Sequence, residues 1–254
     1  MDLTGNSAIV SGGVGGLGEA TVRRLSDAGM HVVIADLDDE RGKVLADELQ
    51  TTYVHTDVTD EASLGAAVAA AADLGPLRIA VSAHGGPVQV GRVVGRDGTP
   101  LSLEGFRRTV DVYLTGTFNM LRLSAAAMAA TDPDGDGNRG LVVSTASIAA
   151  FEGQVGQSPY AAAKGGVVAL TLVAARDLAP LGIRAMTIAP GTMYTPAFRM
   201  PEEEAQARWG TGVPFPARMG RADEYASLVE HLGRNDYLNG ETIRLDGAQR
   251  FGLK

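Results

Sequence analysis

Short apolar runs alternate with longer segments of helical periodicity along the chain. The apolar runs predict seven strands, at residues 8–10, 32–35, 53–55, 79–82, 141–144, 185–188 and 242–245. Between them, apolar residues recur at helical spacing and predict helices over residues 17–28, 39–49, 61–72, 103–129, 159–179 and 222–232. Because this alternation is typical of repeated strand–helix–strand units with right-handed crossovers, we predict a doubly wound α/β fold with a parallel sheet.

Composition narrows the classes of protein that fit this pattern. Hydrophobic residues make up 45% and charged residues 20% of 254 residues, as in an ordinary globular protein of one domain, here residues 1–254. The net charge of -8 argues against nucleic acid or an anionic membrane as partner. The chain has no cysteine, no basic targeting segment at its start and no uninterrupted apolar run that would span a bilayer, so we expect a cytoplasmic location.

A glycine-rich segment joins the first predicted strand to the first predicted helix. Residues 11–18 read SGGVGGLG. Glycines permit a tight turn and a close approach to a pyrophosphate, whose charge the free amides of a helix start would meet. A close strand–helix crossing without a ligand would also select glycine, but the strand before and the helix after favour a Rossmann-like nucleotide site. The candidate cofactor-binding glycines are Gly12, Gly15, Gly16 and Gly18.

An acidic residue at the end of the second strand bears on which cofactor binds. Asp36 lies where a carboxylate accepts hydrogen bonds from an adenosine ribose, and it would repel a 2′-phosphate, so we predict NAD. Arg41 is close enough in sequence to leave NADP open. Asp57 and Val58, just past the third strand, are expected to flank the adenine. Asp57 could equally cap the next helix.

Candidate catalytic residues follow the fifth strand. Residues 144–166 read STASIAAFEGQVGQSPYAAAKGG, so Tyr160 and Lys164 lie four apart on one helix face. A phenol with a pKa of ~10 needs a shift of about 2 to 3 units to act as a base near neutrality. One ammonium about 4 Å away contributes roughly 4 kcal/mol at an effective dielectric near 20, which is enough. Ser147 would either hydrogen-bond a substrate oxygen or bond nearby backbone.

The spacing of these three residues resembles the short-chain dehydrogenase/reductase family. The chain has Tyr160-x-x-x-Lys164 with Ser147 before it, and it is most similar to the type 2 3-hydroxyacyl-CoA dehydrogenases, also described as 17β-hydroxysteroid dehydrogenases. The similar segments are TASIAAFEGQVGQ, ARDLAPLGIRAMTIAPGT, VPFPARMG and YLNGETIRLDGA. The resemblance covers nearly the whole chain.

This resemblance implies an activity and a set of residue roles. The implied reaction is the NAD-dependent oxidation of a secondary alcohol. The main expectation is that a 3-hydroxyacyl-CoA is oxidised to a 3-oxoacyl-CoA in fatty acid metabolism. A steroid or another small secondary alcohol is the alternative substrate. Tyr160 would be the general base, Lys164 would lower its pKa and hold the nicotinamide ribose, and Ser147 would position the alcohol. The family is commonly a homotetramer. Implied contacts with NAD are Gly15, Leu17, Asp36, Asp57, Val58, Ala83, Gly85, Tyr160, Lys164, Met193 and Thr195.

Three positions depart from the family pattern, and the mildest is Ser11, which keeps the hydroxyl of the Thr that is usual there. Tyr113, in DVYLTGTFN, stands where the family has a catalytic Asn that is thought to hold a water linking the lysine to solvent. We therefore expect reduced turnover with NAD binding retained, or, in the extreme, a catalytically weak NAD-binding scaffold. His84, in SAHG, would either perturb the cofactor pocket or pack as a loop histidine.

Charged loops offer weaker candidates. Arg92 and Arg96 would either meet the phosphates of CoA or remain solvated surface arginines.

The loop at residues 132–137, DPDGDG, resembles the start of a calcium-binding loop. Val143 stands where such a loop requires a bidentate Glu, so the segment predicts a surface turn. The four histidines have no metal-ligand spacing, and we predict no metal site.

Overall fold

Seven parallel strands form the centre of the molecule in the computed structural model, which describes residues 1–253. They lie in the order β3-β2-β1-β4-β5-β6-β7. Each predicted strand lies within an observed one, and the predicted doubly wound α/β fold is confirmed. The strands are β1 (Ser7–Ser11), β2 (His31–Asp36), β3 (Thr52–His55), β4 (Leu77–Ser82), β5 (Gly140–Thr145), β6 (Ile183–Pro190) and β7 (Thr242–Leu245).

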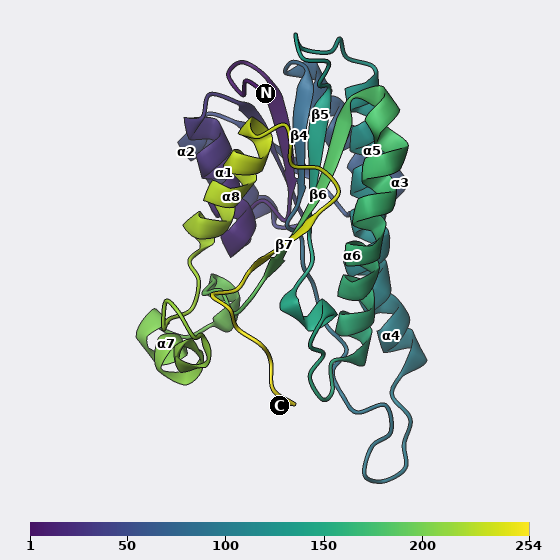
Figure 1. The fold of residues 1–254 in the computed structure, drawn as a ribbon, viewed down its shortest axis with the longest axis vertical. Helices are drawn as coiled ribbons and strands as arrows, with labels where there is room; N and C mark the ends of the chain where they lie inside the picture. The colour runs from purple at the N-terminus through teal and green to yellow at the C-terminus, as the bar shows by residue number, and fades with distance from the viewer. Residues whose placement is uncertain (254) are drawn as a thin grey trace.

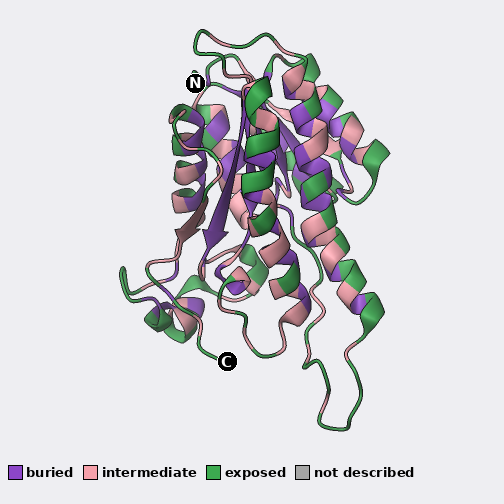
Figure 2. Ribbon diagram, turned by 45° about the vertical axis from the view of Figure 1, so that its right-hand side comes forward, coloured by how far each residue is buried: buried purple, intermediate pink, exposed green. Residues whose placement is uncertain are grey.

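Helices cover both faces of this sheet (Figure 1). One face carries α1 (Gly16–Asp27), α2 (Asp39–Leu49) and α8 (Ala222–Arg234). The other carries α3 (Glu61–Asp73), α5 (Gly116–Ala129) and α6 (Ser158–Leu178). The central strands therefore lie in the interior, while the edge strands β3 and β7 are only partly buried and solvent-exposed residues concentrate on the outer sides of the helices (Figure 2).

Alternate residues of each central strand enter opposite cores. Val32 and Ile34 of β2 belong to the cluster under α1 and α8. Val33 and Ala35 belong to the cluster under α3 and α5. Because side chains alternate across a strand and both sides meet helices, every position between them is apolar, which is why these strands read as continuous apolar runs.

Two regions differ from the expected elements. The predicted helix 103–129 is divided into α4 (Leu103–Val110), a π-helical segment (Asp111–Thr115) and α5, so that the chain passes through one wider turn at Tyr113. The segment between β6 and α8, expected to be a loop, contains α7 (Glu202–Trp209). Short 3₁₀ turns occur at Ile148–Ala150, Ala179–Leu181, Pro196–Phe198 and Gly210–Gly212.

The helix α6 is also apolar and long. Ser158–Leu181 is the one described segment with the length and mean hydropathy, 1.2, of a membrane-crossing helix. It packs against β6 and the π-helical segment and buries Lys164 within the protein. These contacts place one side of α6 in the core, whereas Leu172 and Val173 on its outer side are exposed.

The direction of strand addition reverses between β1 and β4. From β1 the sheet grows towards β3 on one side, and from β4 it grows towards β7 on the other. Loops at the carboxyl ends of the strands diverge at such a reversal and leave a crevice. The glycine-rich segment and the segment after β4 lie there, while α7 and the C-terminal end of the chain lie beyond the strands at the bottom of the view (Figure 1).

Candidate active site

Packing alone explains two of the glycines between β1 and α1. Gly12 has a φ of 70°, and a Cβ there would lie 2.4 Å from the Cα of His84. A Cβ on Gly18 would lie 2.0 Å from the carbonyl oxygen of Gly12. The alternative of a close crossing thus accounts for Gly12 and Gly18. Gly15 and Gly16 line a cleft, and a Cβ on Gly16 would lie 2.7 Å from the Cβ of Thr195.

The start of α1 faces this cleft without a side-chain cap. Gly15 is the N-cap residue and makes no side-chain hydrogen bond, whereas Asp38 and Asp60 cap α2 and α3 by accepting from backbone amides. The first amides of α1 consequently have no acceptor from a capping side chain. A phosphate group would supply one and would be stabilised by the helix dipole.

Asp36 at the end of β2 shapes the neighbouring loop. Its carboxylate accepts hydrogen bonds from the amides of Val14, at 3.1 Å, and Asp38, at 3.1 Å. Arg41 donates to the carbonyl oxygen of Val14 and lies 3.5 Å from the carboxylate of Glu19. This guanidinium is therefore already engaged across the glycine-rich segment, beside the Asp36 carboxylate.

Asp57 is not a helix cap, contrary to one of its two predicted roles. Its carboxylate accepts from the amide and the hydroxyl of Thr59, at 2.8 and 2.7 Å, while Asp60 caps α3 by accepting from Ser63. Val58 is buried, and its carbonyl oxygen accepts from the Asn119 side chain at 3.0 Å. These bonds fix the segment after β3 at the side of the crevice where an adenine is expected.

The three predicted catalytic residues meet in one cleft. Ser147 follows β5, and Tyr160 and Lys164 lie on the first two turns of α6. They line a cleft of about 350 Å³ together with Gly15, Gly16, Leu17, Ala83, Gly85, Met193 and Thr195. Ser147 also accepts a bond from the amide of Ala149 at 3.1 Å, so its backbone role is present beside any role towards a substrate.

The electrostatics of this site differ from the expectation. Burial raises the pKa of Tyr160 to about 12, and Tyr113 adds to this, while a hydrogen bond with Ser147 opposes it. Burial lowers the pKa of Lys164 to about 7. The ammonium nitrogen lies 5.8 Å from the Tyr160 ring centroid and donates to the carbonyl oxygen of Thr145 instead. In the protein alone, desolvation of the phenolate dominates, so the lowering of the Tyr160 pKa by Lys164 stays a prediction for the complex with the oxidised cofactor.

His84 is a packed histidine that also borders the cleft. Its Nε2 lies 3.1 Å from the carbonyl oxygen of Val112, which can only accept, so this nitrogen carries the proton. Its Nδ1 then accepts from the Ser11 hydroxyl at 2.7 Å. Burial, followed by the charge of Lys164, lowers the pKa of His84 to about 4, so the ring is neutral at physiological pH.

A second cavity adjoins the first on the side of α7. It measures about 620 Å³ and shares Ser147, Tyr160 and Met193 with the cleft. Arg208 and Trp209 of α7 line it, as does Phe251 near the C-terminus. These three residues were not predicted from the sequence. A signal for α7 was present, because a run of Glu follows Pro201 and Arg208 lies at the other end, and this order of charges is stabilised by the helix dipole.

Comparisons with known proteins agree with this geometry. The family model described as short chain dehydrogenase matches residues 6–206. The chain belongs to the short chain dehydrogenase family. The 3-hydroxyacyl-CoA dehydrogenase type-2 of Homo sapiens is 45% identical over 98% of this chain and 97% of that protein. The protein of the same name from Drosophila melanogaster is 43% identical over 96% and 97%. The crystal structure of 3-hydroxyacyl-CoA dehydrogenase type-2 from Mycobacterium avium is 57% identical, with a TM-score of 0.95 over 98% of both chains.

This membership confirms the family resemblance and makes the protein an oxidoreductase. It leaves the individual roles of Ser147, Tyr160 and Lys164 as predictions, which the arrangement in one cleft supports. In this short chain dehydrogenase, Tyr113 lies in the π-helical segment and lines the same cleft. Its ring meets the Tyr160 ring edge-on, with centroids 5.2 Å apart.

Proposed function

We propose that the protein oxidises the 3-hydroxyl group of a 3-hydroxyacyl-CoA to a ketone with NAD as the acceptor. The observation that carries this proposal is the position of Tyr160, which lines both the cleft of the glycine-rich segment and the larger cavity under α7. A carbinol in the larger cavity and a nicotinamide in the cleft would meet at this phenol. The names of the relatives support the acyl-CoA as substrate.

The residues of the crevice fit NAD. The uncapped start of α1, with Gly15 and Gly16, would hold the pyrophosphate, and Asp36 would accept from the adenosine ribose. Asp57 and Val58 would flank the adenine, and Met193 and Thr195 would lie beside the nicotinamide. When bound, NAD supplies the acceptor for the hydride that leaves the carbinol carbon.

The chain's own residues would handle the proton. Ser147 would donate a hydrogen bond to the substrate oxygen and keep it beside the Tyr160 hydroxyl. The Tyr160 oxygen would take the proton of the alcohol. Since the pKa of Tyr160 is about 12 in the protein alone, this step requires positive charge near the phenol in the complex. Lys164, and the cationic ring of the oxidised cofactor, would supply it.

The larger cavity favours an anionic substrate over a neutral steroid. Arg208 lines it and rests over the Trp209 ring, with the guanidinium carbon 4.7 Å from the ring centroid. No carboxylate of residues 1–253 lies within 4.0 Å of its nitrogen atoms. This unpaired cation suits a phosphate of CoA. Arg92 and Arg96, the alternatives from the sequence, are exposed in the loop before α4 and line neither cavity.

A direct assay tests the proposed activity. Purified protein is mixed with NAD and 3-hydroxybutyryl-CoA, and the absorbance of reduced nicotinamide is followed. The proposal predicts growth of this absorbance, with NADP far less effective. Tight binding of NAD without turnover of this or any other secondary alcohol would overturn it in favour of a cofactor-binding scaffold.

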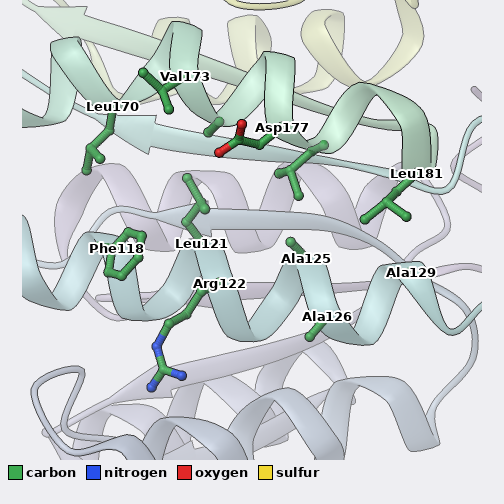
Figure 3. A pocket seen from close by; sticks show the side chains of 12 residues that line it. Phe118, Leu121, Arg122, Ala125, Ala126, Ala129, Leu170, Val173, Asp177 and Leu181 are labelled. Carbon is green, nitrogen blue, oxygen red and sulfur yellow. The ribbon is translucent and has the colours of Figure 1, made fainter.

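We also propose that the protein is a homo-oligomer, a tetramer by family resemblance. An apolar groove of about 320 Å³ runs between the outer sides of α5 and α6 (Figure 3). Phe118 is 46% exposed and Val173 57% exposed there, although both are large and apolar. Arg122 on α5 and Asp177 on α6 place opposite charges on the same surface (Figure 3). A second copy related by a twofold axis would present the same groove and the same pair of charges.

A further inference from the structure

The Lys164 ammonium has unusual surroundings for a buried charge. Its side chain is 3% exposed, and its nitrogen donates to one oxygen, the carbonyl of Thr145, at 2.5 Å. No carboxylate in residues 1–253 lies within 4.0 Å of it. An ammonium has three N–H donors, so two of them have no oxygen acceptor from the protein.

Aromatic rings occupy the remaining space around this charge. The nitrogen lies 4.9 Å from the Tyr113 ring centroid and 5.8 Å from that of Tyr160. Both distances are within the range in which the negative face of an aromatic ring attracts a cation. His84 also lies near, but it is neutral, and its charge would repel Lys164 if it were protonated. The closer of the two ring faces is that of Tyr113.

The Tyr113 ring is held from two sides. Its hydroxyl donates to the carbonyl oxygen of Gly86 at 2.7 Å and accepts from the amide of the same residue at 3.0 Å. The ring edge packs against Tyr160. The wider π-helical turn carries this side chain to the cleft, and the two bonds tie the turn to the segment after β4.

We propose that Tyr113 is a positioning residue, whose ring face holds the Lys164 ammonium in the cleft while its hydroxyl fastens the segment after β4. The role in catalysis rests on the proposed function, because Lys164 is expected to act on Tyr160 and the cofactor. The contact itself exists in the protein alone. It can therefore be tested without cofactor or substrate.

The proposal sets a sign for the pKa of Lys164. Burial lowers this pKa to about 7, and a ring face that attracts the cation opposes the lowering. Tyr113→Leu removes the ring but keeps the surroundings apolar, so the pKa falls by a further ~1 unit. Tyr113→Phe keeps the ring and loses both bonds to Gly86, so it is the matched control.

Nuclear magnetic resonance can follow this group directly. The chain has only three lysines, Lys43, Lys164 and Lys254, so a protein labelled with ¹³C-lysine shows few signals, and a Lys164→Gln variant assigns the one of interest. We expect the parent and Tyr113→Phe to titrate together, and Tyr113→Leu to titrate about 1 unit lower. Circular dichroism confirms that each variant is folded. A folded Tyr113→Leu protein that titrates with the parent would overturn the proposal.

Kinetics provide a second readout. If the charged form of Lys164 supports turnover, the alkaline limb of the kcat profile moves to lower pH in Tyr113→Leu and stays in place in Tyr113→Phe. A role limited to the hydroxyl bonds with Gly86 predicts that both variants move this limb alike, since Phe and Leu both lose those bonds. A parent protein without turnover would refute the proposed function, while the titration of Lys164 would still decide the role of Tyr113.

Discussion

Replacing the Asp36 carboxylate tests the predicted preference for NAD. Asp36→Asn removes the charge while keeping the size of the side chain and one acceptor oxygen. Loss of a charge-assisted hydrogen bond to the ribose costs roughly 1.5 to 3 kcal/mol, or about 10- to 150-fold in affinity for NAD. Repulsion of a 2′-phosphate at ~5 Å and an effective dielectric near 20 is about 3 kcal/mol per charge, less when salt screens it. Both effects of Asp36→Asn lower the preference for NAD over NADP.

The measured quantity is the ratio of kcat/KM for NAD to that for NADP, with 3-hydroxybutyryl-CoA in excess. We expect the ratio to fall at least ~10-fold in Asp36→Asn, mainly through KM, because the chemistry at Tyr160 is remote. Asp38→Asn is the matched control: it makes the same change of charge two residues away, at the cap of α2. The reasoning fails if the parent prefers NADP, or if both variants change the ratio equally. Thermal unfolding checks that the loss of the Val14 bond has not melted the loop.

Two further substitutions test the substrate cavity and the helix face. Arg208→Ala should raise KM for 3-hydroxybutyryl-CoA about 5- to 10-fold, since one exposed charge-assisted contact with the CoA is lost. KM for an uncharged secondary alcohol should stay unchanged. An equal rise in KM from Arg92→Ala would show that the CoA binds elsewhere. Val173→Glu should reduce the particle mass in size-exclusion chromatography with light scattering, because two carboxylates would face each other across the twofold axis. Val90→Glu is its control, since Val90 is 66% exposed in the loop before α4. Unchanged mass in Val173→Glu would exclude this helix face as the contact.

The elements of the fold were predictable because their signals are local. Residues 32–35 of β2 and 79–81 of β4 are apolar at every position, and the helices between them repeat apolar residues at helical spacing. The gathering of Ser147, Tyr160 and Lys164 was predictable for a similar reason: a strand end and one helix face bring them together. The helix α7 was missed because its neighbours are rich in Pro and Gly, which masked a short amphipathic stretch.

The properties that depend on distant contacts were not predictable. Tyr113 bonds to Gly86, 27 residues earlier in the chain, and no periodicity shows this pairing or the π-helical turn that permits it. The spacing of Tyr160 and Lys164 indicated proximity but not burial. Burial decides their charges: it raises the pKa of the phenol and lowers that of the amine, against the Coulomb attraction expected from spacing alone.

The central claim is that the Tyr160 oxygen takes the proton of the substrate alcohol. Tyr160→Phe removes that oxygen and leaves the ring contact with Tyr113. We predict a fall in kcat of at least ~100-fold for 3-hydroxybutyryl-CoA oxidation, with NAD affinity within a few-fold of the parent, as loss of a general base requires. Oxidation by Tyr160→Phe at the rate of the unaltered protein would contradict the account.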